Sequence, residues 1–177
     1  MIRITTDFRQ VEKMFAGIKA NLPRVMRDAI NDTATHVRAL AVKDIREKWN
    51  VKAGELRQRI KISPRATVNR LEAMVKANGE PIPLIAFNPR PIRAGVSVAI
   101  VKGKRTLIKG GFITTMKSGH RGVFMRAGRQ RLPIVEKKAI SIPSQWNQKI
   151  AEHARDADLY LQRRLQSRLQ RLIDTGK

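Results

Sequence analysis

The segment from residue 111 to 134 constrains the fold of this chain more than any other. Glycine tolerates backbone conformations that other residues avoid, so its repeated glycines predict turns between short extended pieces. These glycines are Gly111, Gly119, Gly122 and Gly128, preceded by Gly110. Apolar or β-favouring residues able to anchor each piece to a core are Phe112, Val123, Phe124, Leu132 and Ile134. Cations with no acid to balance them are Lys117, Arg121, Arg126, Arg129 and Arg131. The pattern predicts a basic, loop-rich sheet edge that contacts a partner.

The charge of the chain is concentrated around that segment. The sequence holds 37 lysines and arginines against 14 acidic residues, a formal net charge of +23. From Pro81 to Val135 there is no acidic residue, while eleven lysines and arginines fall in the same span. Such a charge repels itself in a compact state and favours a polyanionic partner or an acidic protein neighbour.

Most of these cations are candidates for contacts with a partner. They are Lys102, Lys104, Arg105, Lys109, Lys117, Arg121, Arg126, Arg129 and Arg131. Contacts with DNA phosphates would be independent of base sequence and would weaken steeply with salt. The same cations can instead meet acidic surfaces of neighbouring subunits, or only solvent, and the sequence leaves these alternatives open.

Composition excludes several classes of protein. With 42% hydrophobic residues the chain can bury a core, so wholesale disorder is not expected. Aromatic residues make up only 5%, which argues against a module that stacks nucleic-acid bases. The absence of cysteine excludes disulfides, thiol catalysis and thiolate metal sites. The start lacks the apolar region of a signal peptide, and no apolar run reaches about 18 residues, so we expect a soluble protein without a membrane span.

Helical periodicity is clearest in the first sixty residues. Asp7 and Gln10 have the spacing of an N-terminal capping pair, and apolar residues then recur at helical spacing up to Ile18. Pro23 ends or kinks this helix and opens a second one, predicted to run to about Trp49. The apolar stripe of the second helix is Val25, Ala29, Thr33, Val37, Leu40, Ala41, Ile45 and Trp49. A short helix is expected over residues 51–60.

Strand signals fill the middle of the chain. Residues 67–75 are ambiguous between helix and strand, and we favour a strand because Asn78-Gly79 follows as a turn. Four prolines between residues 81 and 91 predict an edge or loop with residues 84–87 tucked in. The remaining predictions are a hairpin of 95–101 with 105–108 about a turn at 102–104, and a last strand at 133–136.

The C-terminal part predicts one long helix. Ser141 caps it, Pro143 stands in its first turn, and it ends near Gly176. Its apolar stripe is Trp146, Ile150, Ala154, Ala157, Leu161, Leu165, Leu169 and Leu172. Helices, then strands, then a helix predict an α+β fold with long N-terminal helices, a central, mostly antiparallel β-sheet and a long C-terminal helix. We expect one domain over 1–177, made of an N-terminal helical part (1–60), a basic β-sheet (61–138) and a C-terminal helix (139–177).

Ser118 and His120 invite comparison with a hydrolase. Residues two apart on a strand point to the same face, but a serine nucleophile also needs a third group that orients its base. The nearest acids in the sequence are Glu80 and Glu136, and a serine beside glycine is usually a turn residue. We therefore expect no catalytic residues and no enzyme activity.

No cofactor or metal is expected either. His36, His120 and His153 lack the HExxH spacing and a carboxylate cluster around them. Gly103-Lys104 fits a hairpin tip, because no strand-to-helix pattern of a phosphate-binding loop surrounds it.

The segment 111–134 resembles the signature of the lambda-type phage minor tail protein Z family. Members carry a Gly-Phe pair, then Ser-Gly-His-x-Gly-Val-Phe-x-Arg, then Arg-Leu-Pro-Ile. The matching residues here are Gly111, Phe112, Ser118, Gly119, His120, Gly122, Val123, Phe124, Arg126, Arg131, Leu132, Pro133 and Ile134. The likeness extends through residues 83–87 into the first long helix and covers most of the chain. One departure is Ala139-Ile140, where the family tends to have Gly-Pro before Ser-x-Pro.

The resemblance implies a structural protein of a long-tailed phage or prophage. Members of this family are minor tail proteins that act in tail completion, at or near the head-proximal end, where they finish the tail and help to place the DNA end in its channel. The implied partners are other tail and head–tail joining proteins, further copies in a ring, six by analogy with tail symmetry, and DNA without regard to sequence. The implied location is the virion tail, with the host cytoplasm during assembly.

A freestanding nucleic-acid-binding protein is the competing hypothesis. The charge supports it, whereas the poverty of aromatic residues and the lack of any recognised reader motif oppose it. A freestanding binder is expected to bind DNA tightly as a monomer and to lose affinity steeply in salt.

Overall fold

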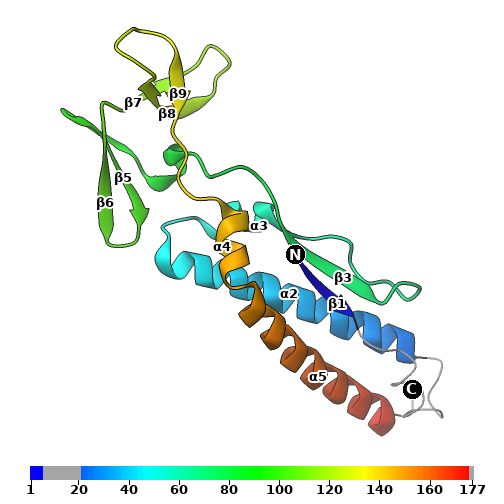
Figure 1. The fold of residues 1–177 in the computed structure, drawn as a ribbon. Coiled ribbons are helices and arrows are strands. Elements are labelled where there is room, and N and C mark those ends of the chain that lie inside the picture. Colours follow the sequence, from blue (N-terminus) through cyan, green and yellow to red (C-terminus); the bar gives the residue numbers. More distant parts are fainter. Residues whose placement is uncertain (6–20, 176–177) are drawn as a thin grey trace.

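The computed structural model describes residues 1–5 and 21–175 (Figure 1). The helix predicted to begin near Asp7, and the helix end predicted near Gly176, lie outside these residues. The elements follow in this order: β1 (Ile2–Thr5), α2 (Leu22–Lys48), α3 (Ala53–Arg59), β2 (Ile60–Ile62), β3 (Glu72–Ala77), the 3-10 helix η1 (Leu84–Phe87), β4 (Arg90–Ile92), β5 (Gly95–Val101), β6 (Lys104–Lys109), β7 (Phe112–Thr115), β8 (Arg121–Arg126), β9 (Ile134–Glu136), α4 (Ile142–Gln148) and α5 (Ile150–Thr175).

The long helices α2 and α5 lie side by side in antiparallel directions and form what we call the helical body (Figure 1). The bounds of α2 agree with the prediction to within one residue at each end. Its buried residues recur at steps of three and four, as an amphipathic helix requires: Met26, Ala29, Ile30, Thr33, Ala34, Val37, Ala41, Val42 and Ile45. Val25 and Leu40 of the predicted stripe are only partly buried. Among the described residues, no helix is long and apolar enough to cross a bilayer.

The strands form three small antiparallel sheets, with the orders β1-β3-β2, β4-β5-β6 and β7-β8-β9. The first sheet packs on α2, and its residues Ile4, Val75 and Ile60 belong to the same hydrophobic core as the buried face of that helix. The other two lie beyond the C-terminal end of α2, and we call them the distal sheets (Figure 1). The predicted α+β class and antiparallel pairing are confirmed.

The one central sheet of the prediction is instead divided into these three. Between β3 and β4 the chain passes Pro81 and Pro83, turns through η1 and then passes Pro89; these prolines lack the N–H donor that a ladder needs. Between β6 and β7, Gly110 adopts a φ of +70°, which turns the chain out of the second sheet.

Local signals placed most strands correctly, with two differences. β3 begins at Glu72 and not at residue 67, because Thr67 and Arg70 exchange backbone hydrogen bonds of 2.9 and 3.2 Å in a turn. The strand β1 lies in the part predicted to be helical, and its partner β3 is some seventy residues away. The tucked segment at 84–87, the hairpin of β5 with β6 and the last strand β9 are confirmed.

The single C-terminal helix of the prediction is two helices, α4 and α5, with a break at Lys149. The predicted cap is present, because the Ser144 N–H donates to Ser141 Oγ at 3.4 Å. At the break, Lys149 leaves helical geometry with φ −113° and ψ 12°. The change of direction is stabilised by tertiary contacts, since Lys149 and His153 both reach Asp44 of α2.

Candidate functional site

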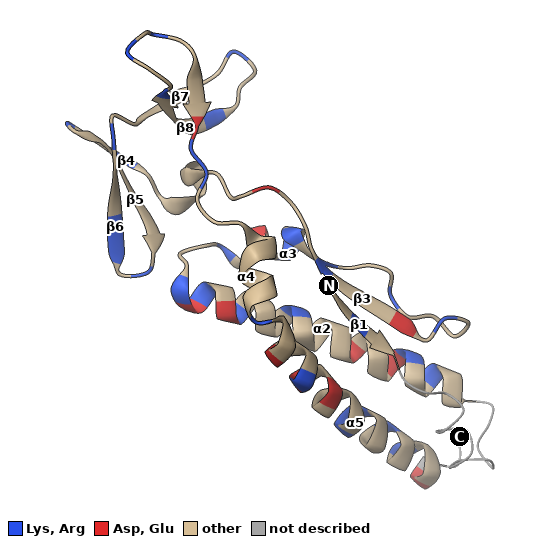
Figure 2. Cartoon of the chain, viewed as in Figure 1, with Lys and Arg blue, Asp and Glu red and all other residues tan. Residues whose placement is uncertain are grey.

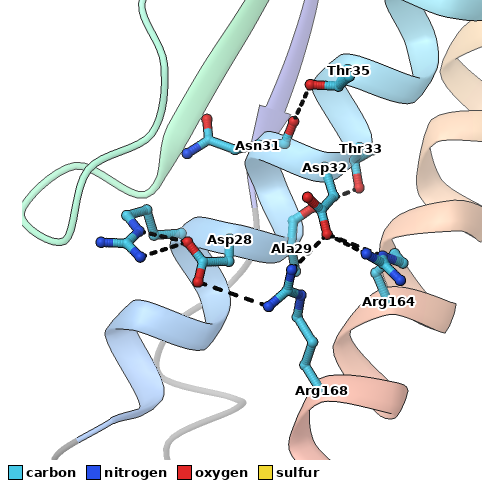
Figure 3. Close-up of polar contacts among 9 residues, drawn as sticks. Asp28, Ala29, Asn31, Asp32, Thr33, Thr35, Arg164 and Arg168 are labelled. Atoms are coloured by element: carbon cyan, nitrogen blue, oxygen red, sulfur yellow. Dashed lines mark hydrogen bonds and ion pairs between the residues drawn. The ribbon is translucent and has the colours of Figure 1, made fainter.

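Acidic side chains of the helical body form ion pairs with basic side chains of the same two helices. Asp32 of α2 accepts hydrogen bonds from Arg164 Nη2 at 2.5 Å and from Arg168 Nη2 at 2.7 Å (Figure 3). Arg168 also approaches Asp28 at 3.8 Å, and Asp28 pairs with its neighbour Arg27. Two arginines, four residues apart on one face of α5, thus converge on one face of α2.

The environment of Asp32 favours its charged form. Burial by itself would raise the pKa of this carboxyl, but the hydrogen bonds from Arg168 and Arg164 outweigh burial and hold the pKa below its usual range. In return, the hydrogen bond to Asp32 raises the pKa of Arg164. Both shifts favour the charged forms of Asp32 and Arg164, as an ion pair requires.

Two further polar contacts link the same helices. His36 Nε2 lies 2.7 Å from Asp156 Oδ2, and the His36 ring stacks on Tyr160 with centroids 3.9 Å apart. At the other end of the interface, the buried His153 lies 3.0 Å from Asp44. Lys149 donates to the same carboxylate at 3.3 Å, and this hydrogen bond raises the pKa of Lys149. Within the part of the chain that the structure describes, no three His, Cys, Asp or Glu side chains gather to hold a metal.

The distal sheets are basic and carry almost no acidic residues, whereas the helical body carries acids and bases in similar numbers. They are built almost entirely from the acid-free span of residues 81–135, which holds eleven lysines and arginines. The one acidic residue in the strands of these sheets is Glu136 in β9. Figure 2 shows the resulting blue segments on strands and loop tips of these sheets, whereas the red segments lie mainly on the helices and the first sheet. The acid-free span of the sequence thus forms a separate, basic part of the structure.

The predicted contact cations do not gather in one patch. Lys102 and Lys104 flank the tip of the β5–β6 hairpin, beside the C-terminal end of α2, where the Lys102 N–H donates to Lys48 O. Lys109 lies at the far end of β6, Lys117 lies in the β7–β8 turn, and Arg121 is the first residue of β8. Arg126 closes β8, and Arg129 and Arg131 lie in the exposed loop between β8 and β9. The cations therefore surround the distal sheets on several sides.

One predicted contact residue, Arg105, has partners within its own sheet. Its guanidinium donates to Ser97 Oγ at 2.8 Å, to Ser97 O at 2.6 Å and to Asn88 O at 3.0 Å. These hydrogen bonds hold Arg105 across β5 and against the end of η1, so part of its role is to stabilise the second sheet.

The residues of the 111–134 signature form the third sheet. Phe112 and Phe124 face each other across β7 and β8, with ring centroids 6.4 Å apart. His120 stands edge-on to Phe124 and lies 2.9 Å from Glu136 Oε1 of β9. A Cβ on Gly122 would lie 2.7 Å from that same Glu136 oxygen and 2.8 Å from the Phe124 ring, so a larger residue would have to displace both side chains. The signature thus encodes a close-packed junction of three strands.

The pairing of His120 with Glu136 was missed by sequence reasoning, although Glu136 was named there as a nearby acid. The pairing depends on the register of β8 with β9, which places Phe124 opposite Glu136. This register cannot be predicted from the sequence of either strand alone. The His120 side chain is 51% exposed, so the pair lies at an open surface and not in a closed cleft. Ser118 and Gly119 are in a turn closed by the Gly119 N–H to Met116 O, as predicted from the sequence.

The rest of the signature lies in a loop and not in a core. Arg131, Leu132 and Pro133 precede β9, and the Leu132 side chain is 65% exposed. Val123, by contrast, is fully buried on β8 and belongs to the main core. The signature therefore has a packed half and an exposed half, and the exposed half includes Pro133, whose C=O accepts the hydrogen bond from Ala127 N–H that closes the loop.

Comparisons with known proteins agree on one family. The sequence profile described as prophage minor tail protein Z matches residues 9–175. A protein named tail completion protein, of Escherichia phage N15, is 26% identical over 140 residues, which are 75% of this chain and 74% of that protein. No solved structure gave a significant match.

Proposed function

This chain belongs to the prophage minor tail protein Z family, a family of structural phage tail proteins, and we propose that it acts in tail completion at the head-proximal end of the tail. The relative from phage N15 carries tail completion in its name, and the residue match covers three quarters of both chains. In this proposal the protein assembles in the host cytoplasm and becomes part of the virion tail.

The observation that carries the proposal is the concentration in the distal sheets of basic residues without acidic residues to balance them. The acids Asp28, Asp32 and Asp44 of α2 form ion pairs with cations of α2, of α5 and of the break between α4 and α5. The distal sheets have no such internal partners for most of their cations, and so they favour polyanions or acidic neighbours. A protein at the junction between tail and head meets both, since the DNA passes there and other subunits surround it.

The proposal includes a ring of copies. Head-to-tail contacts that close on themselves give cyclic oligomers, and six copies would match the symmetry of a tail. Two exposed aliphatic side chains on α5, Leu159 and Ile173, support a contact between the helical bodies of neighbouring copies. The whole described chain would act as one assembly domain in such a ring.

The test of the proposed function is assembly without this chain. Particles made by the encoding phage or prophage after deletion of the gene should show defective tails or unstable head–tail joints in negative-stain images. Supply of the intact chain in trans should restore normal particles. Normal, stably joined particles in the deletion strain would contradict the proposal, as would a purified protein that neither self-associates nor binds tail proteins.

Contact between the distal sheets and DNA predicts a specific salt dependence. Replacing Lys104, Lys109 and Lys117 by glutamine should reduce the slope of log K against log salt by up to about 3, since each phosphate contact contributes about 0.9. The matched control replaces Lys43, Lys52 and Lys61, three exposed lysines in α2, at the N-cap of α3 and in the first sheet. Binding to a duplex of random sequence is measured by fluorescence anisotropy between low and physiological salt.

The two triple variants separate the candidate functions. A smaller slope for the distal variant alone supports DNA contact by the distal sheets. Equal losses for both variants would indicate attraction by net charge only, and tight binding by a monomer would favour the freestanding nucleic-acid-binding protein. Absence of binding at low salt would remove DNA from the proposal and leave protein contacts.

A further inference from the structure

An open groove runs between the two distal sheets. It has a volume of about 710 Å³ and lies between β4 on one side and β7 on the other. Its β4 wall is apolar, with Pro89, Pro91 and the 47% exposed Ile92. Its other wall is β7 itself, Phe112 to Thr115, with Arg121 of β8 at one end. The groove thus combines an apolar wall, a strand and a cation.

Both strands beside the groove are edges of their sheets. The orders β4-β5-β6 and β7-β8-β9 leave β4 and β7 each with one hydrogen-bonded neighbour. An edge strand presents unpaired N–H and C=O groups to any extended chain that lies beside it. Among the described residues, β7 has no backbone hydrogen bond other than those of its own sheet.

The four edges of the distal sheets are not alike. Proteins protect edges by proline, by charged side chains or by making the strand short. β4 is three residues long and contains Pro91, β6 carries Lys104, Arg105 and Lys109, and β9 is three residues long and follows Pro133. β7 reads Phe-Ile-Thr-Thr, four β-favouring residues with neither proline nor charge. Of these four edges, β7 is the one that is longer than three residues and has neither proline nor charge, and it lines the groove.

The charge around the groove selects its occupant. Arg121 lines the groove, and no acid occurs anywhere between Pro81 and Val135. The distal sheets of a second copy are disfavoured in this groove, because they carry the same basic residues without acids to balance them. DNA offers phosphates for Arg121 but has nothing to pair with a strand edge or to cover Ile92. An extended acidic peptide segment satisfies the edge, the apolar wall and the cation together.

We propose that the β7 edge and the groove beside it bind an extended acidic segment of another phage structural protein by strand addition. This inference rests on the proposed function, since it names the chemistry of one partner in the assembled tail. The segment pairs its backbone with β7, places apolar side chains against Ile92, and directs a carboxylate toward Arg121. Alternate side chains of a strand point to one face, so the segment should alternate apolar with acidic or polar residues.

The test uses overlapping synthetic peptides from the tail and head–tail joining proteins encoded beside this chain. They are screened against the full-length protein, and binding peptides should be acidic and rich in β-branched residues. Arg121→Glu and Ile92→Asp should each weaken their binding by about tenfold or more, equivalent to about 1.4 kcal/mol. The matched controls are Arg129→Glu and Leu107→Asp, since Leu107 is also 47% exposed but does not line the groove. Both controls should bind within about threefold of the parent protein.

Hydrogen exchange shows where a bound peptide lies. The amides of Ile113, Thr114 and Thr115 should exchange more slowly when the peptide is present, because strand addition gives β7 a second hydrogen-bonded neighbour. Protection elsewhere, binding that is equally sensitive to the control substitutions, or the absence of any binding peptide would overturn this inference. If the gene is still required for normal tails, such a result leaves the proposed function intact and removes only the groove as a docking site.

Discussion

Replacing Trp146 by alanine should lower the free energy of unfolding by about 3–5 kcal/mol, the range for truncating a large buried aromatic side chain. Trp146 is 1% exposed and is among the largest fully buried side chains of the described chain. It lies on α4, and its ring is 5.3 Å from that of His153 on α5. Loss of the ring would leave a cavity at the joint between α4 and α5, and we expect the variant to be defective in assembly at elevated temperature.

The second tryptophan supplies the matched control. Trp49 is only partly buried, and its indole N–H donates to Gln145 at 3.0 Å. Trp49→Ala should therefore cost less than Trp146→Ala in urea unfolding followed by circular dichroism. Trp146→Phe should also cost less than alanine, because it keeps most of the volume and removes an indole N–H that has no partner in the structure. Equal losses of unfolding free energy for Trp49→Ala and Trp146→Ala would contradict the larger contribution expected from the buried Trp146.

Replacing Asp32 by asparagine should lower the free energy of unfolding by about 2–3 kcal/mol at neutral pH, below the 3–5 kcal/mol of a fully buried ion pair. The substitution leaves Arg164 and Arg168 without their shared carboxylate, but their side chains are 38% and 29% exposed, so solvent offsets part of the loss. Asp158→Asn, at an exposed position on α5, removes the same charge and should have little effect.

The same variant should change the acid stability of the protein. Because the pKa of Asp32 is lowered by folding, its contribution is complete above the ordinary value of 3.8 and is lost as the pH falls through the lower pKa of the folded state. The unfolding free energy of Asp32→Asn should therefore fall less steeply below about pH 4 than that of the parent chain. Parallel curves for the two proteins in urea unfolding from pH 6 to pH 2 would contradict the assigned role of Asp32.

The location of the family signature changes what its residues can be expected to do. Gly122, Phe124 and His120 form a packed junction with Glu136, so they act first on the stability of the third sheet. The exposed residues Arg131 and Leu132, and the β7 edge that begins at Phe112, are the parts of the signature open to a partner. A role of the signature residues in assembly is therefore a proposal, and the exposed residues are the ones that a partner could contact directly.

Local periodicity and turn chemistry accounted for the elements that depend on neighbouring residues. The stripe of α2, the Ser141 cap, the hairpin of β5 with β6 and the tucked segment at 84–87 follow from spacing within a few residues. The predicted strand at 67–75 began too early, because a turn between Thr67 and Arg70 is also local but competes with the alternation. Division into three sheets was foreseeable only in part, from the prolines and from Gly110-Gly111.

The sequence by itself determined the α+β class, the bounds of the longest early helix, and the separation of acids from the basic span, since each depends on residue type or on short spacing. Only the tertiary structure decided the contacts between distant segments. Asp32 meets Arg164 across 132 positions, and His120 meets Glu136 through a strand register that neither segment specifies alone. Likewise, Lys149 at the break between α4 and α5 meets Asp44 on another helix, across 105 positions. Such contacts form because whole apolar faces pack together, and packing places polar partners that no local pattern can pair.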